Sequence, residues 1–323
     1  MADELILIDA YSQIFRAFYA IRQLTNSRGE PTNAVFVFTR LLLGIQKEYP
    51  TSRGAMLFDC GKVEFRMKLN PEYKANRPPM PEALRTQIPV IRELAEAFGW
   101  PLLEEPEYEA DDLAAAFARA AEGPVKIISS DKDLAQLVDD RVTMLSPAPR
   151  NAGFEERGVA EITAKFQVPP ALLIDYLALL GDSSDNIPGV PGIGAKGAAQ
   201  LLNTYGPASE WLEHPEKLAG TKFEKKLAGA GDILKRNQEL IRLRSDLPER
   251  FSDLGAVLVR REPDWAKIAD ICRRMELKSI LKELPVVPEN APEPDQDDLF
   301  SAVSAAPAPE TAPSPAMEQG ELF

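Results

Sequence analysis

Short, nearly continuous apolar segments recur in the first half of the chain. Leu5–Ile8, Ala55–Phe58 and Val125–Ile128 are apolar at almost every position, a pattern typical of strands buried on both faces of a parallel sheet. A further strand is expected at Arg141–Leu145. Because parallel strands need long crossover connections, helices should separate these segments.

The intervening stretches carry the spacing of helices. Tyr11–Ile21 and Asn33–Lys47 place apolar residues along one side of a helix. The order strand, helix, strand predicts an α/β domain over residues 1–166, with a mainly parallel central sheet and flanking helices. Beyond it the pattern becomes helical throughout, which predicts a second, helical domain at residues 167–285.

A glycine-rich turn lies inside the predicted helical domain. Gly192, Gly194 and Gly197 have the spacing of a dinucleotide-binding fingerprint, but no strand precedes them, and we reject that interpretation. Glycines before a helix N-terminus also let a phosphate approach free backbone N–H groups. We therefore expect a helix-hairpin-helix at about residues 186–203, with Lys196 adding a cation.

The charge of the chain is unevenly distributed. The formal net charge of −13 over 323 residues would by itself argue against a nucleic-acid partner. Residues 286–323 hold eight acids and no Lys or Arg, so residues 1–285 carry only −5. This last segment is rich in Pro, Ala, Glu and Ser and cannot bury enough apolar surface to fold. We expect an acidic, disordered tail and a folded part that can still bind nucleic acid.

Several classes of site and location are excluded by composition. Cys60, Cys272 and His214 are the only cysteines and histidine, so no zinc set or disulfide framework can be built, and triad chemistry would depend on His214 alone. The N-terminus lacks the pattern of a signal peptide, and no apolar run approaches about 18 residues. We expect a soluble cytoplasmic protein with no membrane partner.

Carboxylates are the candidate chemistry. Three apolar segments each stop at an aspartate, namely Asp9, Asp59 and Asp131, and Glu109-Ala-Asp-Asp112 leads into an alanine-rich helix. Acids at a helix N-terminus can simply complement the macrodipole, and one aspartate after a strand is a common turn residue. Four such groups at one edge of a sheet would repel each other unless a cation lay among them, which predicts a metal site.

Residues 61–82 mix bases with aromatics and have little core pattern. Tyr73, Lys74 and Arg77 stand close together in this segment. It could be a mobile arm whose cations meet phosphates while Tyr73 packs on a base or sugar. The alternative is a solvated loop.

Seven short motifs follow one another along the chain, and together they are specific. They are Leu5–Asp9, Thr25–Ala34, Tyr73–Arg77, Tyr108–Asp112, Ser129–Asp133, Gly181–Asn186 and Gly189–Gly194. In this order they closely resemble the 5′-nuclease domain of bacterial DNA polymerase I, a member of the flap-endonuclease family. The resemblance covers about residues 3–284. It implies a nuclease core of the PIN-like or resolvase-like kind, followed by the helix-hairpin-helix domain.

The resemblance also implies roles for individual positions. Residues 61–82 would form an arch through which a 5′ end passes, with Lys74 and Arg77 orienting the scissile phosphate. The implied metal ligands are Asp9, Asp59, Glu109, Asp111, Asp112, Asp131, Asp133, Asp182 and Asp185. The implied DNA-binding residues are Arg16, Tyr73, Lys74, Arg77, Gly192, Gly194 and Lys196.

The implied chemistry is hydrolysis of a phosphodiester by a structure-specific 5′-3′ exonuclease or flap endonuclease. Two or more Mg²⁺ ions, with Mn²⁺ as a substitute, suit a ligand set of carboxylates without His or Cys. A K⁺ ion at the helix-hairpin-helix is also implied. The substrates would be DNA with 5′ flaps, nicks or RNA primers, cut by a monomer. The alternative is a non-catalytic, clamp-associated protein that binds branched DNA.

Two pentapeptides in the tail share one pattern. Each has a Gln followed, three residues later, by Leu-Phe, and each resembles the peptide that binds the bacterial sliding clamp. The residues concerned are Gln296, Leu299, Phe300, Gln319, Leu322 and Phe323. The usual Leu at the second position is replaced by Asp297 or Gly320. The tail is therefore predicted to tether the protein to the clamp.

Overall fold

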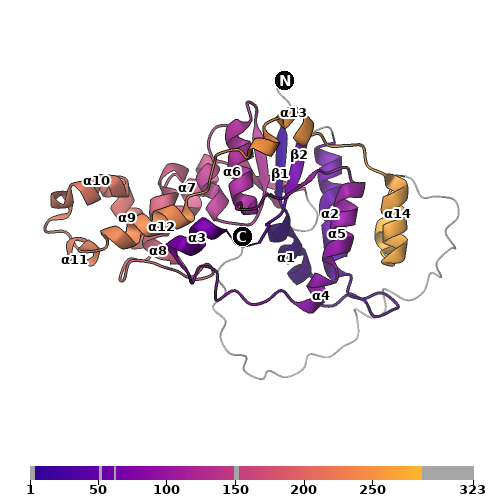
Figure 1. Cartoon of the computed structure of the whole chain (residues 1–323), viewed down its shortest axis with the longest axis horizontal. Coiled ribbons are helices and arrows are strands. Elements are labelled where there is room, and N and C mark those ends of the chain that lie inside the picture. Colours follow the sequence, from indigo (N-terminus) through magenta and orange to yellow (C-terminus); the bar gives the residue numbers. More distant parts are fainter. Residues whose placement is uncertain (1–3, 51–52, 62, 149–152, 286–323) are drawn as a thin grey trace.

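A six-stranded sheet lies at the centre of the larger part of the molecule (Figure 1). The computed structural model describes residues 4–50, 53–61, 63–148 and 153–285. The sheet has the order β3-β2-β1-β4-β5-β6, parallel throughout except for β6, which runs antiparallel to β5. The strands are β1 (Leu5–Asp9), β2 (Arg53–Leu57), β3 (Leu102–Leu103), β4 (Val125–Ile128), β5 (Val142–Pro147) and β6 (Phe154–Arg157). The predicted mainly parallel α/β architecture is confirmed.

Helices cover both faces of this sheet. On one face they are α1 (Ala10–Ala20), α2 (Asn33–Glu48) and α5 (Ile88–Ala97), and on the other face α6 (Ala110–Ala120). The same part of the chain also contains α3 (Glu64–Leu69), α4 (Glu82–Arg85) and α7 (Val159–Phe166). Neighbouring strand residues point into different cores: Leu7 joins the core that includes Phe117 of α6, whereas Ile8 joins the core that includes Phe38 of α2. All four side chains are fully buried. Two-sided burial is the reason why the strands are apolar at consecutive positions.

The helical part extends away from the sheet on the side of α6 (Figure 1). It contains α8 (Leu173–Leu180), α9 (Ala195–Tyr205), α10 (Ala208–Glu213), α11 (Glu224–Leu227) and α12 (Gly231–Ile241). Between α8 and α9 the chain forms a small hairpin of β7 (Gly181–Asp182) and β8 (Ile187–Pro188). Buried Asn237 of α12 donates to Ala178 O at 3.0 Å and Pro188 O at 2.7 Å, which ties the hairpin to the helices.

The chain then returns to the α/β domain before residue 285, the residue at which the helical domain was expected to end. The final helices are α13 (Leu254–Val257), α14 (Trp265–Arg274) and α15 (Lys278–Leu281). Trp265 of α14 packs edge-on against Phe98 with ring centroids 5.9 Å apart, and α15 packs against α2. Helical periodicity identifies these elements but not the partner that their apolar faces cover.

The arch also differs from the mobile arm or solvated loop that its composition suggested. It contains α3, and Tyr73 is only 7% exposed. Asparagine side chains fix it to the β7–β8 loop: Asn70 donates to Asn186 O at 3.0 Å, and Asn76 donates to Ser183 O at 2.7 Å. Contacts across more than 100 residues of sequence leave no local pattern, so they could not be read from the segment itself.

Across the ranges that the structure describes, no helix combines the length and apolar character needed to cross a membrane.

Gly189 provides a test of how tightly the β7–β8 hairpin is held. A Cβ added there would lie 2.1 Å from Leu180 O, so we expect Gly189→Ala to lower the free energy of unfolding by about 2–3 kcal/mol. Gly197→Ala is the matched control, because the nearest atoms to its added Cβ are 4.0 Å away, within helix α9. The control should be stabilised by about 0.4–1 kcal/mol. Urea unfolding of both variants checks this, and equal stability of the two would contradict the packing described.

Candidate metal centre and nucleic-acid interface

Two of the strand-end aspartates are fixed by hydrogen bonds at the carboxyl edge of the sheet. Asp9 ends β1 and caps α1: Oδ1 accepts from Ser12 N at 3.1 Å, and Oδ2 accepts from Ser129 Oγ at 2.7 Å. Asp59 follows β2, and its Oδ1 accepts from Ala110 N at 2.7 Å. The start of helix α6 is thereby joined to the end of β2.

The loop after β4 supplies two further carboxylates. Asp131 N donates to Ser129 Oγ at 2.9 Å, and Asp133 N donates to Asp131 Oδ1 at 2.9 Å. Each hydrogen bond spans two residues, as in the turns that Asp and Ser favour. The loop thus curls at the edge of the sheet and directs both acids toward the same space.

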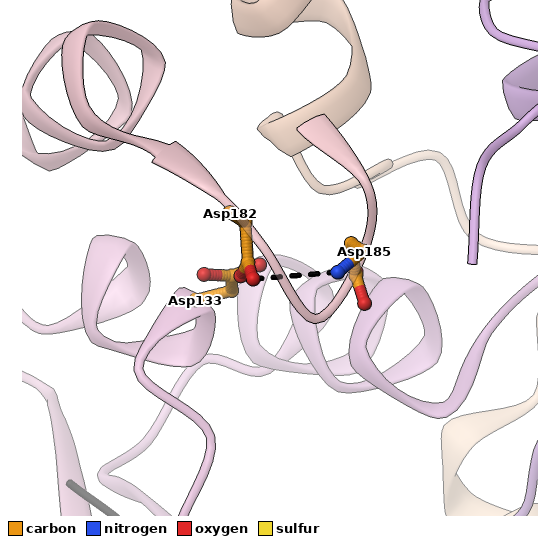
Figure 2. A group of neighbouring side chains, drawn as sticks. All are labelled: Asp133, Asp182 and Asp185. Atoms are coloured by element: carbon orange, nitrogen blue, oxygen red, sulfur yellow. Dashed lines mark hydrogen bonds between the residues drawn. The ribbon is translucent and has the colours of Figure 1, made fainter. Parts of the chain in front are cut away.

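Asp133 is joined there by two acids from the helical part (Figure 2). Asp133, Asp182 and Asp185 offer carboxylate oxygens that all lie within 4.8 Å of one another. Asp182 and Asp185 belong to the β7–β8 hairpin, where Asp185 N donates to Asp182 Oδ1 at 3.3 Å. Three acids from segments about 50 residues apart therefore form one cluster.

The carboxylates repel one another strongly. Burial, followed by the charge of Asp59, raises the pKa of Asp9 to about 7 from an ordinary value of 3.8. Burial also raises the pKa values of Asp111, Asp131 and Asp133, and charges of neighbouring acids add to the rise. In every case the ionised form is penalised by lost hydration and by like charges. A cation placed among these groups would relieve both penalties.

Side-chain cations lie among the acids in the structure. Lys74 Nζ is 2.7 Å from Glu109 Oε1 and 4.0 Å from Asp185 Oδ2. Arg77 Nε donates to Asp185 Oδ1 at 3.0 Å, and the Tyr73 hydroxyl lies 3.2 Å from both Glu109 Oε2 and Asp185 Oδ2. These arch residues contact carboxylates, so the predicted stacking of Tyr73 on a base or sugar would require it to leave this buried position.

Lys132 supplies another counter-charge. Its Nζ lies 3.0 Å from Asp182 Oδ2. Burial favours a higher pKa for Asp182, but the Lys132 charge and the Ser184 hydroxyl outweigh it, and the pKa of Asp182 falls below its ordinary value. Sequence reasoning passed over Lys132 although it stands between Asp131 and Asp133, and that position was the available signal.

Asp112 occupies a different environment from the other predicted ligands. Its carboxylate is fully buried and forms two hydrogen bonds with the guanidinium of Arg66, at 2.6 and 2.7 Å. Arg66 NH1 also lies 3.3 Å from Glu109 Oε2. Arg66 was not singled out from the sequence, because an arginine in a polar segment carries no signal that its partner lies 46 residues further along the chain.

The predicted DNA-binding positions lie in three places, and Tyr73, Lys74 and Arg77 occupy the first of them, among the acids. Gly192, Gly194 and Lys196 are exposed at the start of α9, on the helical part. Arg16 lies elsewhere: its guanidinium donates to Pro147 O at 2.9 Å, and it lines a cavity of about 820 Å³ beside α1 and α2. The structure therefore gives Arg16 no contact with the carboxylates.

The six predicted clamp-binding positions, from Gln296 to Phe323, lie outside the described residues.

Both halves of the chain match models of known protein families. Residues 4–167 match the N-terminal, resolvase-like domain of 5′-3′ exonucleases, and residues 168–264 match their C-terminal domain, described as a SAM fold. A 5′-3′ exonuclease of Aquifex aeolicus is 37% identical over 284 residues, which cover 87% of this chain and 94% of the relative.

Two further matches agree. DNA polymerase I of Thermus aquaticus is 37% identical over 303 residues, or 91% of this chain, but the match spans only 35% of the polymerase. The flap endonuclease of bacteriophage T5, in a pseudo-enzyme-product complex with DNA and metal ions, has a TM-score of 0.59 at 25% identity. That alignment covers 84% of this chain and 99% of the phage protein. The chain therefore belongs to the 5′-3′ exonuclease family of metal-dependent nucleases, as its sequence motifs predicted.

Proposed function

We propose that this protein hydrolyses phosphodiester bonds near the 5′ ends of DNA, at flaps, nicks and RNA primers, by a two-metal-ion mechanism. The observation that supports it most directly is the convergence of carboxylates from separate segments, with Asp133, Asp182 and Asp185 oxygens within 4.8 Å of one another. Burial and neighbouring charges raise the pKa values of Asp111, Asp131 and Asp133 beside this cluster, and carboxylates perturbed in this way are concentrated at functional sites.

The donor set fits divalent magnesium. It consists of carboxylate oxygens, which are the hard ligands that Mg²⁺ and Mn²⁺ prefer. The residues that would hold the ions are Asp9, Asp59, Glu109 and Asp111 on one side and Asp131, Asp133, Asp182 and Asp185 on the other; Asp112 is considered separately below. Two such ions, about 4 Å apart, supply an activated water and neutralise charge on the phosphoryl and leaving oxygens.

Arch cations would orient the substrate. Lys74 and Arg77 already lie against the carboxylates, and a phosphate brought to the same place would accept from the same donors. The backbone of Lys74 is fixed beside the hairpin: its φ of 57° lies in the left-handed region, and its N–H donates to Asp185 O at 3.1 Å. A metal ion that took over Glu109 and Asp185 would free these two cations for the phosphate, where they would stabilise developing charge.

The start of α9 would hold the duplex. Gly192 and Gly194 are exposed, so phosphates can approach backbone N–H groups there, and Lys196 adds a charge. A backbone carbonyl of this turn already contacts a positive charge, because Lys226 Nζ donates to Gly192 O at 2.8 Å. A K⁺ ion coordinated by backbone carbonyls of the same turn forms part of the proposal. Contacts of this kind read the DNA backbone and suit an enzyme, acting as a monomer, that must bind any sequence.

Replacing Asp59 tests the catalytic assignment. Asp59→Asn removes a charge at the edge of the sheet while an oxygen remains to accept from Ala110 N, so the fold should survive. We expect cleavage of a 5′-labelled flap to fall by on the order of 1,000-fold, with DNA affinity in Ca²⁺ almost unchanged. Single-turnover kinetics and fluorescence anisotropy measure the two quantities. Near-normal turnover would refute the assignment, and absence of metal-dependent cleavage by the unaltered protein would favour the non-catalytic alternative.

The raised pKa of Asp9 predicts how stability depends on pH. Its folded pKa of about 7 exceeds the ordinary 3.8, so the unfolded chain binds fewer protons between these values. The free energy of unfolding of metal-free protein should therefore fall as the pH rises through this window. Metal binding requires the ionised acids, so stabilisation by Mn²⁺ should grow over the same window.

Thermal unfolding with EDTA or with MnCl₂ at about pH 5.5 and about pH 8 measures both trends. Asp9→Asn is the control, because it removes one of the titrating groups and should flatten the metal-free profile. A metal-free Tm that rises between these two pH values would contradict the electrostatic description of the site.

Binding of the tail to the bacterial sliding clamp also belongs to the proposal. Gln296, Leu299 and Phe300, together with Gln319, Leu322 and Phe323, would enter the clamp pocket and raise the local concentration of the nuclease at flaps. Truncation after residue 285 should abolish clamp binding in surface plasmon resonance and leave cleavage of free flaps unaltered. Full clamp affinity in the truncated protein would rule the tether out.

A further inference from the structure

The oxygens of Asp112 are fully used by protein donors. Oδ1 accepts from Arg66 NH2 at 2.7 Å and from Arg244 N at 2.9 Å. Oδ2 accepts from Arg66 NH1 at 2.6 Å and from Glu109 N at 3.1 Å. A carboxylate has about four acceptor sites, so none is left to face a metal ion.

Burial reinforces this conclusion. Asp112 is 0% exposed and Arg66 is 1% exposed. A bidentate arginine–carboxylate pair has a fixed geometry, and neither partner could turn to another ligand without leaving the other charge buried and unpaired. Asp112 is therefore held inside the protein and does not border the open side of the carboxylate cluster.

The pair acts on Glu109 in two ways. Asp112 fixes the Glu109 backbone through its N–H, and Arg66 NH1 lies 3.3 Å from Glu109 Oε2. The other side of the Glu109 carboxylate faces Lys74, 2.7 Å from Oε1, next to Asp185. Glu109 is thus the link between the buried pair and the metal-facing acids.

The pair also connects three segments of the protein. Arg66 belongs to α3 of the arch and Asp112 belongs to α6. The helical part contributes Leu240 O, which accepts from Arg66 Nε at 3.1 Å, and Arg244 N. The position of Glu109 is therefore set at a junction where the arch, helix α6 and the helical part meet.

We infer that Arg66 and Asp112 are positioning residues, and that they hold the Glu109 carboxylate in place for metal binding while Asp112 itself is not a ligand. This inference rests on the proposed function, because it gives Glu109 a metal to bind. Partners that orient a metal ligand from behind affect metal affinity by about 10–100-fold.

The test compares Mn²⁺ binding to Asp112→Asn and Arg66→Gln by isothermal titration calorimetry, on the full chain without DNA. We expect both variants to bind the same number of ions as the unaltered protein, with affinity lowered by a similar factor of about 10–100. For Arg66→Gln the direction of the change in Mn²⁺ affinity is decisive. Removing a positive charge near a cation site should by itself strengthen metal binding, so weaker binding points to lost positioning.

A Glu109→Gln background separates positioning from general damage. If the pair acts through Glu109, then Asp112→Asn or Arg66→Gln should lower Mn²⁺ affinity no further in that background. Asp175→Asn is the matched structural control: Asp175 is also a buried helix aspartate, and its partners are Ala208 N, at 2.7 Å, and the Gln238 amide, neither of them a proposed ligand. It should lower the Tm and leave Mn²⁺ affinity unchanged.

The outcomes are distinct. Loss of an ion in Asp112→Asn with unaltered or stronger binding in Arg66→Gln would make Asp112 a ligand and overturn the inference, whereas absence of Mn²⁺ binding in the unaltered protein would overturn the proposed function itself. If Asp112→Asn fails to fold, Arg66→Lys replaces it. That variant keeps the charge but loses the bidentate geometry, and an affinity equal to that of the unaltered protein would refute positioning by Arg66.

Discussion

Repulsion among buried carboxylates is the constraint on which the rest of this structure depends. Burial and neighbouring charges raise the pKa values of Asp9, Asp111, Asp131 and Asp133 together. Such an arrangement lowers the stability of the folded chain, so it must be held by contacts made elsewhere. The two apolar cores of the sheet, one on each face, supply that support.

Repulsion among the acids is also reduced by basic side chains of the same protein, which lie at the site. Lys74, Arg77 and Lys132 each contact an acid of the cluster. Divalent ions and a DNA phosphate would compete for the same acids and the same cations. In the proposed function, metal binding, release of the arch cations from the acids and capture of the scissile phosphate would therefore be parts of one exchange of counter-charges.

Sequence reasoning predicted the features whose signal is local. Apolar runs ending at Asp9 and Asp131 identified strands of the parallel sheet and the edge at which acids gather, because two-sided burial and strand direction leave a direct mark on the sequence. It could not predict that Arg66 pairs with Asp112, or that α14 returns to pack on the α/β domain. Those contacts join residues far apart in the chain, and periodicity does not report them.

Anomalous diffraction from crystals grown in MnCl₂ would test the account most directly. We expect manganese ions bound to the oxygens of Asp133, Asp182 and Asp185 and to the acids at the ends of β1 and β2, with Asp112 still paired to Arg66. Crystals that held no manganese among these oxygens, with Lys74 and Arg77 still in contact with Glu109 and Asp185, would contradict it.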